Sequence, residues 1–93
     1  MGLPIGTVAV VTAGTAVQVV ASGNAVHAVS FKARPTNAGP IYVGGDAVGS
    51  GSGYRLDPGD ELSLAFRETV DLRRFYVDAD NNNDSLDYVG VSA

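Results

Sequence analysis

The chain has 93 residues, a formal net charge of −4 at pH 7, twelve glycines, one histidine and no cysteine. This is the length of one domain, and so small a domain buries a limited core, so we expect self-association or docking on a partner to add stability. The lack of cysteine excludes disulfides and thiolate metal sites, and a single histidine excludes a histidine-rich metal site. The chain has ten acidic and six basic residues, and the basic residues form no cluster. This composition argues against nucleic-acid binding, because that binding depends on basic side chains that neutralise phosphates.

The first 30 residues carry no charged side chain, so a signal peptide or a membrane span has to be considered. No lysine or arginine precedes the apolar run, and glycine, proline, threonine and glutamine residues interrupt it. The segment therefore predicts neither, and we expect no contact with a membrane. We divide the chain into an N-terminal arm, residues 1–7, and a single β-domain, residues 8–93.

Strand formers dominate the chain. Valine is the commonest residue, and short runs of alternating polarity take the place of long helical stretches. Apolar side chains alternate with polar or small ones in two of these runs. Val29, Phe31 and Ala33 share one face of the first run, and Leu62, Leu64 and Phe66 share one face of the second. In chain order, the predicted strands are residues 7–12, 15–20, 25–34, 41–44, 54–56, 61–66, 75–80 and 85–91.

The connections between these runs carry turn and loop chemistry. Residues 44–53, GGDAVGSGSG, predict a flexible loop that reaches over a surface, with Val48 as its one apolar contact point. The Pro-Gly pair at 58–59 suits the central positions of a type II turn. Residues 67–74 predict a loop or a single helical turn, and residues 81–84, NNND, predict a hairpin turn between the last two strands.

About seven or eight short strands at close spacing, with turn signals between nearly all of them, indicate an all-β fold. The pattern is typical of a small antiparallel β-sandwich or barrel. The strand count leaves open whether the strands close into a barrel or divide into two sheets.

No stretch of the chain predicts a metal, cofactor or catalytic site. Residues 78–84, DADNNND, have asparagine and valine where an EF-hand loop needs glycine and glutamate, so we interpret them as a solvated hairpin tip. The open alternative is a calcium site that combines Asp78, Asp80, Asn82 and Asp84 with distant ligands. The glycine-rich loop matches neither phosphate-binding pattern and lies among acidic residues. The carboxylates of Asp57, Asp60 and Glu61 belong to an exposed turn, and His27 is interpreted as a strand-surface or interface histidine. We therefore expect no enzyme and no cofactor.

Four tyrosines, at positions 42, 54, 76 and 88, leave two interpretations open. Aromatic rings pack on the apolar faces of sugars, so the four rings are candidates for a carbohydrate-binding face. Each tyrosine also fits a strand position where the ring covers the edge of the core and the hydroxyl group reaches water.

Four groups of residues follow one another along the chain: Ala33 with Asn37 and Gly39, then IYVG at 41–44, then GYRLDPGD at 53–60, then LRRFYV at 72–77. Through these pieces and their order, residues 29–91 resemble small virion proteins of tailed bacteriophages. The chain departs from the pattern of these phage proteins in the long loop at 44–53 and in the acidic tip at 78–84. The resemblance therefore implies nothing about the contacts that these two loops make.

The resemblance implies a non-enzymatic structural protein of a phage virion, most simply a decoration or cement protein that binds and stabilises the head shell. It would be made in the cytoplasm of the bacterial host and lie on the exterior of the head. Its expected partners are the major capsid protein and sister subunits, in a homo-oligomer for which a trimer is favoured. The candidate partner-binding residues are Met1, Leu3, Pro4, Ile5, Gly44, Gly45, Val48 and Tyr54.

Two other functions are compatible with the same residues. One is a carbohydrate- or receptor-binding module of a phage fibre or tail, which would use the exposed tyrosines. The other is a head-tail joining component, which would form a closed ring.

Overall fold

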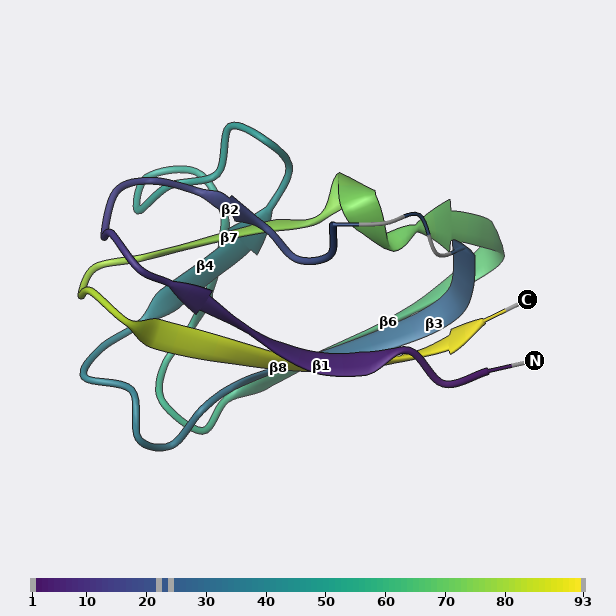
Figure 1. The fold of residues 1–93 in the computed structure, drawn as a ribbon, viewed down its shortest axis with the longest axis horizontal. Coiled ribbons are helices and arrows are strands. Elements are labelled where there is room, and N and C mark those ends of the chain that lie inside the picture. The colour runs from purple at the N-terminus through teal and green to yellow at the C-terminus, as the bar shows by residue number, and fades with distance from the viewer. Residues whose placement is uncertain (1, 22, 24, 93) are drawn as a thin grey trace.

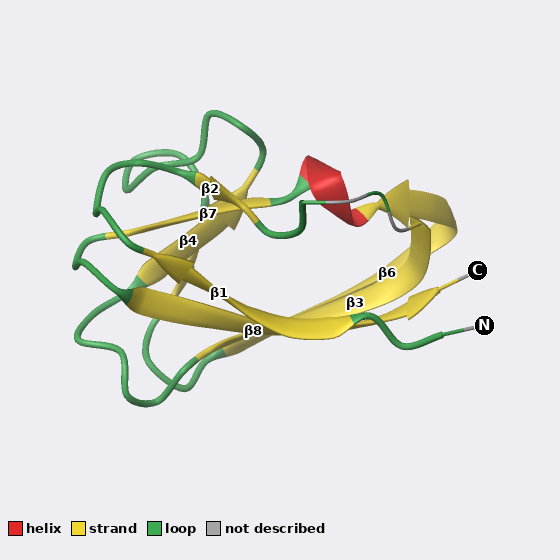
Figure 2. Cartoon of the chain, in the orientation of Figure 1, coloured by secondary structure: helices red, strands yellow, loops and turns green. Residues whose placement is uncertain are grey.

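The computed structural model of the chain describes residues 2–21, 23 and 25–92, and it shows two antiparallel sheets of four strands packed face to face (Figures 1 and 2). No α-helix occurs within those residues, and the only helical turn among them is a 3-10 turn, η1. The predicted all-β fold is therefore confirmed. Of the barrel and the sandwich that the sequence left open, the structure shows the sandwich. The elements are β1 (Ile5–Val10), β2 (Val17–Gln18), β3 (Ala25–Ala33), β4 (Ile41–Gly44), β5 (Tyr54–Leu56), β6 (Glu61–Asp71), η1 (Leu72–Arg74), β7 (Tyr76–Ala79) and β8 (Asp84–Ser92).

The two sheets interleave the chain rather than dividing it into halves. One sheet has the order β1-β8-β3-β6 and the other has the order β2-β7-β4-β5. Strand β8, near the C-terminus, lies between β1 and β3, so the two ends of the chain run side by side (Figure 1). Folding thus requires contacts between residues at opposite ends of the sequence.

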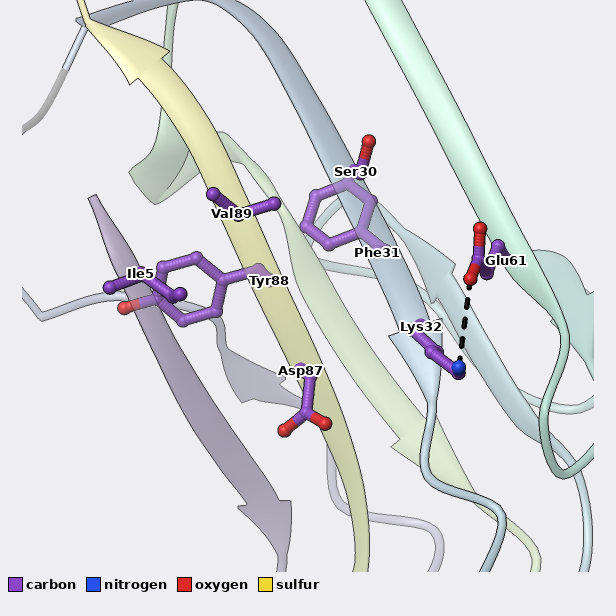
Figure 3. Close-up of a pocket in the computed structure, with 8 residues that line it drawn as sticks. All are labelled: Ile5, Ser30, Phe31, Lys32, Glu61, Asp87, Tyr88 and Val89. Atoms are coloured by element: carbon purple, nitrogen blue, oxygen red, sulfur yellow. Dashed lines mark ion pairs between the residues drawn. The ribbon is translucent and has the colours of Figure 1, made fainter. Parts of the chain in front are cut away.

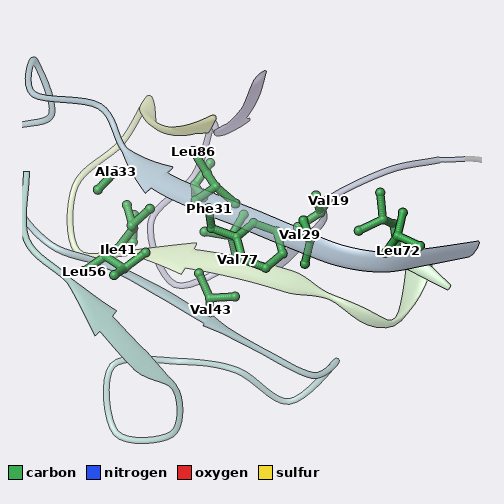
Figure 4. Close-up of a cluster of buried hydrophobic side chains, with 13 residues drawn as sticks. Val19, Val29, Phe31, Ala33, Ile41, Val43, Leu56, Leu72, Val77 and Leu86 are labelled. Carbon is green, nitrogen blue, oxygen red and sulfur yellow. The ribbon is translucent and has the colours of Figure 1, made fainter. Parts of the chain in front are cut away.

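The core fills the space between the sheets, where the inward side chains of alternating strands meet (Figure 4). In β3, Val29, Phe31 and Ala33 are buried, as the alternation predicts. Phe31 also packs against Phe75 with ring centroids 5.2 Å apart, in the tilted arrangement that aromatic pairs favour. The other buried core residues are Val10, Val19, Val26, Ile41, Val43, Leu56, Leu72, Val77, Ala79 and Leu86.

The DPGD turn forms as predicted. Gly59 has φ of 89°, and the amide of Asp60 donates to the carbonyl of Asp57 over 2.8 Å. Both features belong to a type II turn, in which the third residue needs a positive φ that glycine adopts without strain. The Gly59 amide also donates to the Ala33 carbonyl over 2.9 Å, so the turn extends the pairing of β3 with β6.

The predicted hairpin at residues 81–84 is wrong. Strands β7 and β8 follow one another in sequence but belong to different sheets: β7 pairs with β4 and β2, while β8 pairs with β1 and β3. The residues between them, with Asn83 at φ 68°, carry the chain from one sheet to the other. Turn-forming residues indicate a reversal of the chain, but they do not indicate that the flanking strands hydrogen-bond to each other.

Three strands, β1, β2 and β6, differ from the sequence-based expectation by more than one residue at a boundary. Strand β1 starts at Ile5 rather than residue 7, and the strand expected over 15–20 shortens to the two residues of β2. Strand β6 continues to Asp71, through residues that predict a loop or a helical turn, and only Leu72–Arg74 form that turn. The irregular pairing of β3 with β6 near His27 lets β6 resume its pairing at Val70, so tertiary pairing extends the strand.

Residues 2–7, most of the predicted N-terminal arm, hydrogen-bond along β8. Ile5, Gly6 and Thr7 belong to β1, and before them the carbonyls of Pro4 and Gly2 accept from the amides of Gly90 and Ser92 over 2.8 and 3.0 Å. This part of the arm is therefore continuous with the edge of the sheet.

Two side chains fasten the connection between β3 and β4 to the start of β8. The side-chain oxygen of Asn37 accepts from the Ser85 amide over 2.8 Å, while its side-chain nitrogen donates to the Ser85 carbonyl over 2.9 Å. The buried carboxylate of Asp84 accepts from the amides of Ala38 and Gly39 over 2.8 and 3.1 Å. Side chains thus satisfy backbone groups where no strand is available.

We expect replacement of Asp84 by alanine to destabilise the domain, because two backbone donors would lose their acceptor. A hydrogen bond to a charged group contributes about 1.5–3 kcal/mol, so the free energy of unfolding should fall by about that amount in urea denaturation. The exposed Asp46 provides the control, since Asp46→Ala removes the same charge from the surface of the loop. Equal stability of the two variants would contradict this role for Asp84.

Candidate interaction surfaces

Four exposed apolar side chains gather on the outer face of the β1-β8-β3-β6 sheet. Leu3, Ile5, Val89 and Val91 have 65%, 74%, 39% and 37% of their surface exposed. Ile5 lies opposite Val89 in the register of β1 with β8, and the bonds from Gly90 and Ser92 continue that register so that Leu3 lies opposite Val91. We call these four residues the outer-face patch.

The alternation of β8 accounts for the position of the patch. Leu86 is fully buried and Tyr88 packs against the core, which turns Val89 and Val91 to the outside. Tyr88 lies across β1 at Gly6, where a Cβ atom would come within 2.8 Å of the tyrosine hydroxyl. A glycine is therefore needed at position 6 for Tyr88 to cover this end of the core.

The outer face next to the patch carries charged side chains that neutralise one another. Asp87 accepts from the hydroxyl of Thr7 over 2.6 Å and from Nε of Arg34 over 3.0 Å. Lys32 lies 3.6 Å from the carboxylate of Glu61 (Figure 3). A shallow depression of about 300 Å³ connects these pairs with Ile5 and Val89. The sheet thus presents an apolar region, the outer-face patch, beside a region of paired charged side chains.

A second apolar surface lies where the two sheets diverge, and we call it the inter-sheet groove. It has a volume of about 460 Å³ and is lined by residues of β4 and the loop after it, of β5 and β6, and of η1 and the residue that follows it. Leu62 and Leu64 point inward from β6 but remain half-buried, because this end of the sandwich is incompletely covered. Its lining residues are Val43, Gly44, Gly45, Tyr54, Leu62, Leu64, Arg74 and Phe75.

The structure distributes the predicted partner-binding residues over three environments. Leu3 and Ile5 belong to the outer-face patch, while Gly44, Gly45 and Tyr54 line the inter-sheet groove. Pro4 is half-buried and turned toward Gly90. Met1 lies outside the described residues.

Val48 does not extend from the loop as expected. Only 7% of its surface is exposed, because the loop folds back and places its side chain against Gly44 and Gly53. The glycines at positions 44 and 53 thus allow close packing of Val48. An apolar residue in a glycine-rich segment can bury itself locally, so its exposure cannot be read from the sequence.

The sequence reasoning did not single out Val89 and Val91 in the patch, nor Leu62 and Leu64 in the groove. The alternation of residues 85–91 contains the signal for the first pair, since it places Leu86 and Val89 on opposite faces. The neighbours of these residues in space, however, depend on which strand pairs with which. Leu62 and Leu64 were predicted only to share one face of their strand, and that face packs against the core at its uncovered end.

The four tyrosines do not form a common face. Tyr42 is buried in β4, Tyr54 is exposed on β5, and Tyr76 and Tyr88 are half-buried in opposite sheets. Burial and then the 3.0 Å hydrogen bond from the Tyr42 hydroxyl to Asp80 raise the pKa of that phenol. Tyr42 is thus held as a neutral hydrogen-bond donor at neutral pH.

The acidic residues of the 78–84 segment interact with the protein itself. Asp78 accepts from the amides of Gly14 and Ala79 over 3.0 and 2.8 Å, and Asp84 caps the amides before β4. Within the part of the chain that the structure describes, no three histidine, cysteine or acidic residues gather as a metal site would require. These carboxylates therefore have structural roles.

Fold and surfaces define a small antiparallel β-sandwich with two exposed apolar regions. Comparisons with protein-family models, with curated proteins and with solved structures gave no match for this chain. Among the described residues, no helix has the length and apolar character that spanning a membrane requires.

We expect Gly53→Ala to destabilise the loop, because the added Cβ would come within 2.5 Å of Cγ2 of Val48 and 3.2 Å of Cβ of Tyr42. Overpacking of this kind costs about 1–3 kcal/mol, measurable as a lower free energy of unfolding in urea. Gly51→Ala is the matched control, since nothing lies within 4 Å of the atom that it adds. A Gly53 variant as stable as the Gly51 variant would refute the packing role of Val48.

Proposed function

We propose that the protein is a non-enzymatic structural protein of a phage virion that binds the outside of the head shell as a decoration or cement protein. The observation that carries the proposal is the outer-face patch, in which Leu3, Ile5, Val89 and Val91 lie side by side on one face of a regular sheet. Contiguous exposed apolar side chains mark surfaces that bind other proteins. The resemblance of residues 29–91 to small phage virion proteins supplies the kind of partner.

The scaffold suits adhesion. The patch residues belong to two hydrogen-bonded neighbours, β1 and β8 with their flanking residues, so little conformational entropy is lost when a partner covers them. The ion pairs around Asp87 and Glu61 neutralise the charges closest to the patch. An apolar partner surface can therefore approach without burying an uncompensated charge.

The polar residues of the domain support a role without bond-making chemistry. The buried carboxylates of Asp78 and Asp84 are both occupied by backbone amides, and Asp80 accepts from Tyr42. Hydrogen bonds to Asp57 and Asp71 raise the pKa of Arg55 and Arg73, so both guanidinium groups remain charged and paired. Each of these groups has a structural partner, as a cement protein requires.

We expect Val91→Asp to weaken binding to head shells that lack the protein. Burying one valine side chain contributes about 1.5–3 kcal/mol, which corresponds to about a ten- to hundredfold change in the dissociation constant, and a charge at this position adds a desolvation cost. Cosedimentation with the shells over a range of protein concentrations measures the change. Thr69→Asp, which adds the same charge at an exposed position of β6, should bind like the unchanged protein. Unaltered binding of a folded Val91 variant would rule out the patch.

Copy number separates the proposal from its alternatives. A cement protein should be present in hundreds of copies per particle, whereas a joining component would form a ring of about 6 to 12 copies. Quantitative mass spectrometry of purified virions, referenced to the major capsid protein, gives the ratio. Ring-like stoichiometry would favour the head-tail joint, and measurable glycan binding by the purified protein would favour the receptor-binding module.

A further inference from the structure

Strand β1 has one open edge. Within the described residues it pairs with β8 alone. The carbonyls of Gly2 and Pro4 accept from β8, so the even-numbered residues direct their backbone groups toward β8. In an antiparallel ladder the direction alternates from residue to residue, so the amides and carbonyls of the odd-numbered residues point to the open side. Ile5, Thr7 and Ala9 thus present unpaired donors and acceptors there.

This edge lacks the protection that the other edges carry. Proteins usually block strand pairing at an edge with charged side chains, proline, irregular pairing or short length. The edge strand β6 carries Arg67 and Glu68, and its pairing with β3 contains a register shift. The edge strand β5 carries Arg55, and the edge strand β2 is only two residues long. Strand β1 has six residues, with no charge and no proline.

The open edge is complementary to itself. Its odd-numbered residues are all exposed, and in chain order they are Leu3, Ile5, Thr7, Ala9 and Val11. This series is symmetric in character about Thr7, with small or apolar side chains on both sides. In an antiparallel pair centred on Thr7, Ile5 would lie opposite Ala9 of a second copy, and Leu3 would lie opposite Val11.

We infer that two copies of the chain associate through β1, in an antiparallel pair centred on Thr7, and form a continuous eight-stranded sheet. The pairs formed by residues 5, 7 and 9 contribute about six backbone hydrogen bonds between the copies. Leu3 and Val11, each 65% exposed in the single copy, lie just outside the paired residues, Leu3 before β1 and Val11 directly after it. The occupant of the edge is thus a second copy of this chain.

The charge distribution permits this association. Each copy carries a net charge of −4, but the first 31 residues have no charged side chain, so the copies meet at an uncharged segment. The closest acidic pair is Asp87 of each copy, one strand inward from β1 and paired with Arg34. The two carboxylates would be about 14 Å apart, which is three strand spacings and beyond the Debye length of about 8 Å at physiological ionic strength.

The pairing has a geometric consequence for the outer-face patch. The two-fold axis of an antiparallel strand pair is perpendicular to the sheet, so both copies direct their outer faces to the same side. Both patches can then bind one surface together, which raises the overall affinity through effective concentration. The arrangement is a dimer rather than the trimer favoured from the sequence, and it does not depend on the proposed function.

Single cysteines test the register, because the chain has none of its own. In the inferred pair, Thr7→Cys places two cysteines opposite one another, within the 4.4–6.8 Å between Cα atoms that a disulfide spans. Ala9→Cys is the matched control: its cysteine lies about 14 Å along the strand from its equivalent in the other copy. Under mild oxidation we expect the Thr7 variant to form a covalent dimer and the Ala9 variant to stay single.

A mixture of Ile5→Cys and Ala9→Cys chains extends the test, since these two positions are opposite one another and should cross-link to each other but not to themselves. Light scattering of the unchanged protein should give twice the 9.5 kDa mass of one chain. A monomer or trimer mass at micromolar concentration overturns the inference. Cross-linking that is equal at positions 7 and 9, or absent from both in folded protein, overturns it as well.

Discussion

The pairing of β8 with β1 and β3 is the interaction on which the rest of the structure depends. It joins segments near the two ends of the chain into one sheet and, through the alternation of β8, directs Leu86 and Tyr88 toward the core. The same alternation turns Val89 and Val91 outward, beside Leu3 and Ile5. The core and an exposed apolar surface thus come from opposite faces of the same strand.

Polar side chains complete this arrangement where strand pairing ends. Asn37 and Asp84 bind the backbone between β3 and β4 to the start of β8, and Asp78 accepts the amide of Gly14. Each buried carboxylate therefore substitutes for a missing strand neighbour, which explains acidic residues in an interior that has no charged partner for them. Asn37 and Gly39 are two of the residues on which the resemblance expected from the sequence rests, and both contribute hydrogen bonds to this connection.

The outer-face patch and the open edge of β1 suit different partners. The patch is an apolar surface that a flat partner can cover, whereas the edge offers directional hydrogen bonds to another strand. They share Leu3 and Ile5 but are oriented at right angles to one another, so a second copy can occupy the edge while a third protein covers the patch. In the proposed function, such a pair would bind the particle surface through two patches at once and therefore more tightly than a single copy.

The sequence by itself determined the strand content, the inward set of Val29, Phe31 and Ala33, and the type II turn at Gly59, because these depend on alternation and on local backbone preferences. It also directed attention to Leu3 and Ile5. Only the tertiary structure decided that β7 and β8 occupy different sheets, that Val48 is buried, and that Val89 and Val91 complete the patch. The physical reason is that alternation says which residues share a face of a strand, whereas the neighbour of that strand is chosen by pairing between residues as far apart as Thr7 and Asp87.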